Sequence, residues 1–228
     1  MFHYRFSRRM IGAMLLGVVS LASLPAANAA VVRLEVNAQV VYRAAGLNVA
    51  AAPFQLGDPV SIVGYYDTTA SDLNPDATGR YHMISLNVTV GSYSASTSNP
   101  AALSMVVVDG ESAGFGRDYL RVLSPFPYPG PAIAGDPVLG YPLVGFELTM
   151  EDYTKTVFGN SLPPESFDVG SFNSFFGQII FNDYYAGPIA SFGNFSGSAS
   201  VVPLPAAVWL FGTGLLGLGG FAKRRPSD

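Results

Sequence analysis

Few side chains in this sequence could do acid–base or nucleophilic chemistry. There is no cysteine, which excludes thiol nucleophiles, disulfides and thiolate metal sites. The two histidines are His3 and His82, and no Gly-x-Ser-x-Gly nucleophile elbow accompanies them. Because His82 lies beside an alternating apolar segment, we expect it to be a surface or half-buried residue. We assign no catalytic residue.

Paired carboxylates are the remaining route to catalysis. A glycosidase needs two of them roughly 5 to 10 Å apart in a groove. The candidates are Glu111, Glu147, Glu151, Asp152 and Glu165. Sequence spacing alone does not bring two of these across one cleft. Glu147 alternates with Phe146 and Leu148, so it belongs to the polar side of its strand and we expect it to be exposed to solvent.

A cluster of oxygen ligands between residues 67 and 79 could bind calcium. Its members are Asp67, Asp72, Asn74 and Asp76. A hard cation needs several such oxygens on a tight bend, but Ala77 and Met83 stand where an EF-hand requires glycine and a bidentate glutamate. An EF-hand is therefore excluded. Asx turns between two strands explain the same residues and are the favoured interpretation, and no other cofactor is expected.

The elements that carry these residues are predicted to be strands. Apolar and polar residues alternate, which is the period of a half-buried strand. The clearest segments are 32–42, where the even positions would face the core, 84–90 and 195–201. Less regular ones are 60–66, 103–108, 119–123, 144–150 and 178–182. About eight strands with Gly-, Pro- and Asn-rich breaks favour an all-β fold, an antiparallel β-sandwich or jelly roll.

Two of the breaks are long enough to be surface loops. One is 67–79. The other, 124–142, contains six prolines, which favour extended polyproline geometry over strand pairing. A short helix is compatible with 152–158. No internal repeat is present, which disfavours propellers and solenoids.

The N-terminus has the order of an export signal. Arg5, Arg8 and Arg9 precede an apolar stretch, and a small-x-small cleavage site follows it. We expect residues 1–29 to be a signal peptide that signal peptidase cuts between Ala29 and Ala30, with Ala27 at the other small position. The run 7–11 also resembles a twin-arginine signal, although the general secretory machinery is the favoured route.

The C-terminus has the order of a membrane-held segment. Residues 206–222 carry no charge, and Lys223, Arg224 and Arg225 form a basic stop in the tail 223–228. Positive flanks stay on the cytoplasmic side, so the body, 30–201, would lie outside the inner membrane. A helix of this length covers about 25 Å, short of the roughly 30 Å hydrocarbon core. Five glycines weaken it further, so we predict a transmembrane helix that is a temporary anchor.

The segment 202–228 closely resembles the PEP-CTERM sorting domain of Gram-negative bacteria, in its VPLPA form. The motif residues are Val202, Pro203, Leu204, Pro205 and Ala206. The resemblance implies that a membrane-embedded exosortase recognises the two prolines and cuts near them. The chain would then be the substrate and supply no catalytic group. The resemblance also implies an association with exopolysaccharide and biofilm.

Charge and motifs together lead to three functional alternatives. Between the two terminal segments, six basic residues face fifteen acidic ones, a net charge of about −9, which disfavours nucleic-acid binding. We favour an exported non-catalytic protein, tethered to the inner membrane as a precursor and then sorted to the cell surface or extracellular matrix. The second alternative is a glycan-binding module that exposes Tyr65, Tyr66, Phe126, Tyr128, Tyr184 and Tyr185. The third alternative is a polysaccharide-active enzyme.

Overall fold

The alternation of apolar and polar residues builds long antiparallel strands. The computed structural model describes residues 30–73, 78–111, 113–124, 132–183 and 185–203. Eight long strands follow one another: β1 (Val31–Arg43), β2 (Pro59–Asp67), β3 (Gly79–Val90), β5 (Ser104–Val108), β6 (Asp118–Ser124), β8 (Leu143–Asp152), β10 (Ser174–Phe181) and β11 (Ile189–Val201). Three short strands are added: β4 (Tyr93–Thr97), β7 (Ile133–Gly135) and β9 (Phe167–Asp168). The all-β prediction is confirmed.

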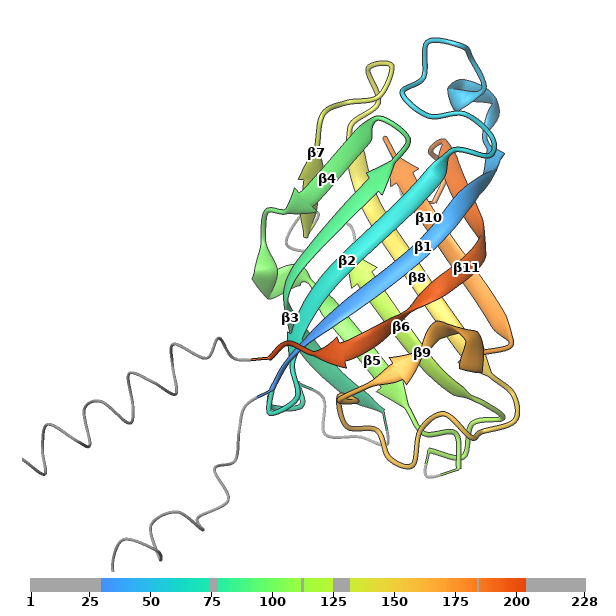
Figure 1. The fold of residues 1–228 in the computed structure, drawn as a ribbon. Coiled ribbons are helices and arrows are strands. Elements are labelled where there is room, and N and C mark those ends of the chain that lie inside the picture. The colour runs from blue at the N-terminus through green and yellow to red at the C-terminus, as the bar shows by residue number, and fades with distance from the viewer. Residues whose placement is uncertain (1–29, 74–77, 112, 125–131, 184, 204–228) are drawn as a thin grey trace, which may run out of the picture.

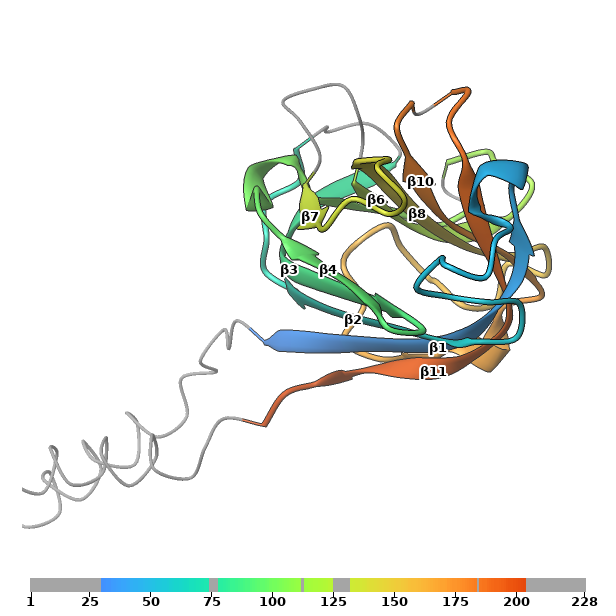
Figure 2. The same cartoon turned by 90° about the horizontal axis from the view of Figure 1, so that it is seen from above.

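The eight long strands close into a barrel instead of splitting into a sandwich. Each pairs antiparallel with the next long strand in the chain, and β11 returns to pair with β1. Figure 2, which looks onto one end, shows the strands running around a ring. The predicted sandwich or jelly roll is therefore wrong in its layering, because one continuous sheet surrounds the core. The short strands extend this sheet locally: β4 pairs with β3, β7 with β4, and β9 with β11.

Side chains fill the interior of the barrel. Val32, Leu34 and Val36 of β1 are fully buried, as are Phe146, Leu148 and Met150 of β8. Loops cover both ends (Figure 1). At one end the loop between β1 and β2, which contains η1 (Ala45–Leu47), packs Phe54 against Tyr93 and Phe181. At the other end, beside η3 (Val169–Ser171), three rings pack edge to face: Phe158, Phe167 and Phe172.

Bulges overturn the predicted face of two apolar residues. The pairing of β1 with β11 shifts between Val40 and Tyr42, and Tyr42 is 52% exposed. A second shift lies where β2 pairs with β3, and it leaves Ile84 on the outer surface. Because a one-residue slip turns every later side chain to the other face, strict alternation could not predict either position.

Two loop predictions also need correction. Residues 152–158 do not form a helix: Asp152 ends β8, and a turn and irregular backbone follow, in which the Asp152 carboxylate accepts the backbone N–H groups of Thr154 and Thr156. Within 124–142, β7 pairs with β4, although pairing was disfavoured there. Residues 125–131 of that segment lie outside the described ranges. One further short helix, η2 (Pro100–Ala102), connects β4 to β5.

The two ends of the described chain leave the barrel side by side. The backbone N–H of Val202 donates to the carbonyl of Val31 at 2.8 Å, and Figure 1 shows the start of β1 next to the end of β11. The predicted signal peptide, 1–29, and membrane helix, 206–222, lie outside the described residues. Within the described ranges, no helix is long and apolar enough to cross a membrane.

Candidate functional site

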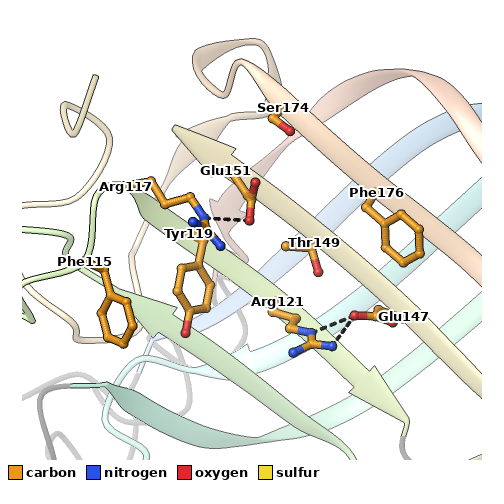
Figure 3. Close-up of a pocket in the computed structure, with 9 residues that line it drawn as sticks. All are labelled: Phe115, Arg117, Tyr119, Arg121, Glu147, Thr149, Glu151, Ser174 and Phe176. Carbon is orange, nitrogen blue, oxygen red and sulfur yellow. Dashed lines mark hydrogen bonds and ion pairs between the residues drawn. The ribbon is translucent and has the colours of Figure 1, made fainter. Parts of the chain in front are cut away.

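A shallow hollow lies on the outer face of β6, β8 and β10. Its volume is about 330 Å³. Period two places every second residue of each strand on this face, so β6 contributes Tyr119 and Arg121, and β8 contributes Glu147, Thr149 and Glu151. Ser174 and Phe176 of β10 complete one side, and Phe115 and Arg117, which precede β6, complete the other (Figure 3). We call these nine residues the outer trough.

Two ion pairs mark the two ends of the outer trough. Arg117 Nε donates to Glu151 Oε1 at 2.7 Å, and Arg121 Nε donates to Glu147 Oε1 at 2.8 Å, with a second contact from Arg121 Nη2. Register explains both pairs: Arg121 lies opposite Thr149, which puts Glu147 on the diagonal. Diagonal neighbours on one sheet face are within reach of long side chains.

The two ion pairs differ in burial. The side chain of Glu147 is only 9% exposed, whereas that of Glu151 is 18% exposed and both arginines are about 40% exposed. Gln178 Nε2 also donates to Glu147 Oε2 at 3.3 Å. The prediction that Glu147 is solvent-exposed is therefore wrong. The residue is on the outer face as expected, but its neighbours from β6 and β10 cover it.

Aromatic rings flank both sides of the outer trough. Phe115 is 44% exposed and Phe176 is 45% exposed, on opposite sides (Figure 3). The Arg117 guanidinium lies over two tyrosine rings, 6.0 Å from the Tyr119 centroid and 5.7 Å from the Tyr153 centroid. Cation–π contacts of this kind hold an arginine in place, so polar and aromatic groups are fixed next to one another.

Tyr153 extends the ion pair between Arg117 and Glu151. Its hydroxyl donates to Glu151 Oε2 at 2.9 Å. This hydrogen bond to a carboxylate raises the pKa of Tyr153 above its ordinary value. Both oxygens of Glu151 therefore accept a hydrogen bond, which holds the carboxylate in one orientation.

The carboxylates do not form the pair that a glycosidase needs. Glu147 and Glu151 lie four residues apart on one strand, roughly 13 Å at the usual rise, and each is bound to an arginine. Asp152 is fully buried and points to the barrel end, where Thr154 and Thr156 donate to it. Glu111 and Glu165 are exposed on loops.

The predicted calcium ligands are only partly described. Asp67 accepts the backbone N–H of Thr69 at 2.7 Å and Asp72 that of Arg80 at 2.9 Å, as in Asx turns and related loop bonds. Asn74 and Asp76 lie outside the described residues. Among the residues that are described, no group of three or more His, Cys, Asp and Glu side chains could hold a metal ion. Calcium binding stays a prediction.

The other candidate residues from the sequence, His82 and the aromatics that the structure describes, do not lie in the outer trough. His82 is exposed on β3, as expected. Of the six aromatics predicted to bind a glycan, Tyr66 is fully buried and donates to the carbonyl of Pro164, Tyr65 is half-buried, and Tyr185 is 89% exposed. These three described residues therefore do not form one exposed surface. Phe126, Tyr128 and Tyr184 lie outside the described part of the chain.

The described residues of the two predicted processing sites flank the barrel. Ala30 comes directly before β1, and its carbonyl accepts the N–H of Thr68. Val202 and Pro203 follow β11 and are exposed. Other residues of these sites lie outside the described ranges: Ala27, Ala29, Leu204, Pro205, Ala206, Lys223, Arg224 and Arg225.

Sequence reasoning missed the outer trough, although a signal was present. Arg117, Tyr119 and Arg121 alternate along β6 and the residue before it, and Glu147, Thr149 and Glu151 alternate along β8. Two alternating triplets of opposite charge indicate facing surfaces. Their register could not be read from the sequence, since long loops separate the strands.

Comparison with known proteins gives no further guide to the site. No family model, no curated protein and no solved structure matches this chain.

Proposed function

We propose that this chain is an exported, non-catalytic protein of the cell surface or extracellular matrix, sorted by an exosortase through its C-terminal signal. The observation that carries the proposal is the extent of the barrel. Its first strand begins at Val31, directly after the expected signal-peptidase cut, and its last strand ends at Val201, directly before the sorting motif. Cleavage at both sites would leave every strand and every core residue of the described ranges in the product.

The chain after β11 suits recognition by a protease. The N–H of Val202 is the last backbone donor paired with β1, and Pro203 has no N–H with which to continue the ladder. A proline also biases the residue before it toward extended geometry. Two prolines separated by Leu204 therefore favour an extended peptide, which a protease cleft can bind.

The adjacent ends of the barrel suit a tethered precursor. The basic residues near each terminus favour a cytoplasmic location for the two termini. Because β1 begins beside the end of β11 (Figure 1), both connections would reach the inner membrane from the same end of the barrel. The resemblance to PEP-CTERM signals then suggests the partners: signal peptidase, an exosortase and the exopolysaccharide of the matrix.

Fractionation of cells tests the proposal. We compare the wild-type protein with the double variant Pro203→Ala, Pro205→Ala in a host that makes an exosortase. The wild type should leave the inner membrane for the surface or medium. The variant should accumulate in the inner membrane as a longer precursor, because its recognition peptide has lost both fixed φ angles.

Pro59→Ala is the matched control. Pro59 is an exposed proline at the start of β2 and lies outside the motif. This variant should be sorted like the wild type. Release of the double variant at the wild-type rate and length would contradict the proposal.

A further inference from the structure

The outer trough combines groups that suit a sugar. A sugar ring has apolar C–H faces and a rim of hydroxyl groups, so a protein binds it with exposed aromatic rings and with side chains that donate and accept in pairs. Phe115 and Phe176 supply exposed rings on opposite sides. Arg121 and the hydroxyl of Thr149 supply polar groups between them, and the ion pair with the largely buried Glu147 holds Arg121 in place. We propose that the outer trough binds a neutral glycan chain.

The charges of the outer trough favour a neutral ligand. Arg117 and Arg121 are each balanced by a carboxylate, so the nine residues carry no net charge. The body around them has a net charge of about −9 and would repel a polyanion. Arg121 has five N–H donors, of which two contact Glu147 Oε1. The others have no partner among the described residues, so they could donate to hydroxyl groups.

The trough is long enough for several sugar units. A second hollow of about 260 Å³ shares Tyr119 and Arg121 with it and continues over β5 to Arg80 of β3. In the order β10, β8, β6, β5, β3, the first and last strands are separated by four strand spacings, roughly 19 Å. A single monosaccharide would occupy only part of this length. The ligand class is therefore an oligosaccharide or polysaccharide.

The sheet around the trough does not suit the other ligand classes. Strands β6, β8 and β10 each pair with a neighbour on both sides, so no free edge is present here for a peptide to join as an extra strand. A lipid chain would require a continuous apolar surface, and two ion pairs interrupt this one.

Affinity electrophoresis tests the inference. The protein, purified from the cells that export it, is run in native gels that contain dextran, laminarin or galactomannan, and in gels that contain alginate. At least one neutral polysaccharide should retard it, and alginate should retard it less. Phe176→Ala should weaken the retardation about tenfold, the scale of a lost stacking contact of about 1.4 kcal/mol.

Tyr185→Ala is the matched control, since Tyr185 is 89% exposed, more than any other large apolar residue in the described ranges, and lies outside the outer trough. It should bind like the wild type. Tyr119→Ala is a second trough variant, and the melting temperature of each variant shows whether it is folded. Titration with oligosaccharides of the retained polymer should give an affinity that rises with length.

Three outcomes would overturn the inference: no retardation by any of the neutral polysaccharides, stronger retardation by alginate, or equal effects of the Phe176 and Tyr185 variants in folded protein. The binding test does not depend on how the protein is sorted. If exosortase processing fails, the glycan-binding inference is therefore unaffected. If the protein does not bind glycans, the sorting proposal is unaffected.

Discussion

At the scale of single residues, two buried carboxylates hold the loops at one end of the barrel. Asp118 and Asp152 lie opposite each other on β6 and β8, and both are fully buried. Asp118 accepts the backbone N–H groups of Gly110 and Phe158, at 2.8 and 3.0 Å. Asp152 accepts those of two threonines. Each buried carboxyl group is thus satisfied by several donors, as a stable interior requires.

The pKa of Asp152 makes this arrangement testable. Burial raises that pKa, but hydrogen bonds from Thr154 and Thr156 outweigh it and lower the pKa to about 2. A folded-state pKa below the unfolded value means that the carboxylate stabilises the fold above about pH 4. This stabilisation is lost as the pH falls from about 4 to about 2.

We therefore expect Asp152→Asn to lower the free energy of unfolding by about 1 to 3 kcal/mol at pH 7. The difference from wild type should shrink between pH 4 and pH 2, where both side chains become neutral. Denaturant unfolding at a series of pH values measures this difference in the free energy of unfolding. A difference that stays constant down to pH 2 would refute this account of the carboxylate.

Asp168→Asn serves as the control. Asp168 is exposed and accepts the N–H of Gly170 at the start of η3. Because a surface substitution has a small effect on stability, the free energy of unfolding of this variant should fall by less than about 1 kcal/mol at pH 7.

The outer trough illustrates what the sequence could and could not predict at this scale. Alternation placed Glu147 on the outer face of its strand, and this was right. Its burial depended on Arg121 and Gln178, which come from two other strands. Side-chain neighbours across a sheet follow from register, and no feature of a single strand specifies register.

At the scale of elements, a bulge in β11 fits the last strand onto the first. The register between β1 and β11 shifts between Asn37 and Gln39. Nearby, Asn194 and Gly197 have φ angles of 55° and 137°. A Cβ atom on Gly197 would lie 2.0 Å from the carbonyl oxygen of Glu35. Only glycine fits here, because both the backbone angle and the close approach exclude a side chain.

Gly197→Ala should therefore destabilise the barrel by at least about 2 kcal/mol, since the new methyl group must push apart the two strands that close the sheet. Gly159→Ala is the matched control. Gly159 is exposed and a Cβ atom there would contact nothing within 4 Å. Denaturant midpoints of the two variants compare them directly, and equal midpoints would contradict the requirement for glycine at this close approach of β11 to β1.

The long strands were predictable and the short ones were not. All eight long strands overlap segments whose alternation or apolar run predicted them. The short strands β4, β7 and β9 have two to five residues. Strands β7 and β9 have three and two residues, too few for alternation to be recognised, and β7 lies in a proline-rich segment that argued against pairing. Strand β4 is as long as β5 but consists mainly of Ser, Ala and Thr, so it lacks the apolar run that marked β5.

At the scale of the whole molecule, the closure of the barrel is the feature that the sequence left open. Each strand of a sandwich or a barrel buries one face, so both folds give the same alternation. The difference is whether β1 pairs with β11, and these strands are separated by almost the whole body. This pairing also brings the two ends of the body together, which is why the fold bears on the proposed sorting.

We propose that the barrel is the product of two cleavages, and the intact mass of the protein shows where both ends of the chain lie. The protein is purified from membrane and medium fractions of cells with and without the exosortase. With the enzyme, the account predicts a chain that begins at Ala30 and ends close to Pro203-Leu204-Pro205. Without it, the chain should begin at Ala30 and still end at Asp228. A chain that ends at Asp228 in cells with an active exosortase would contradict the account.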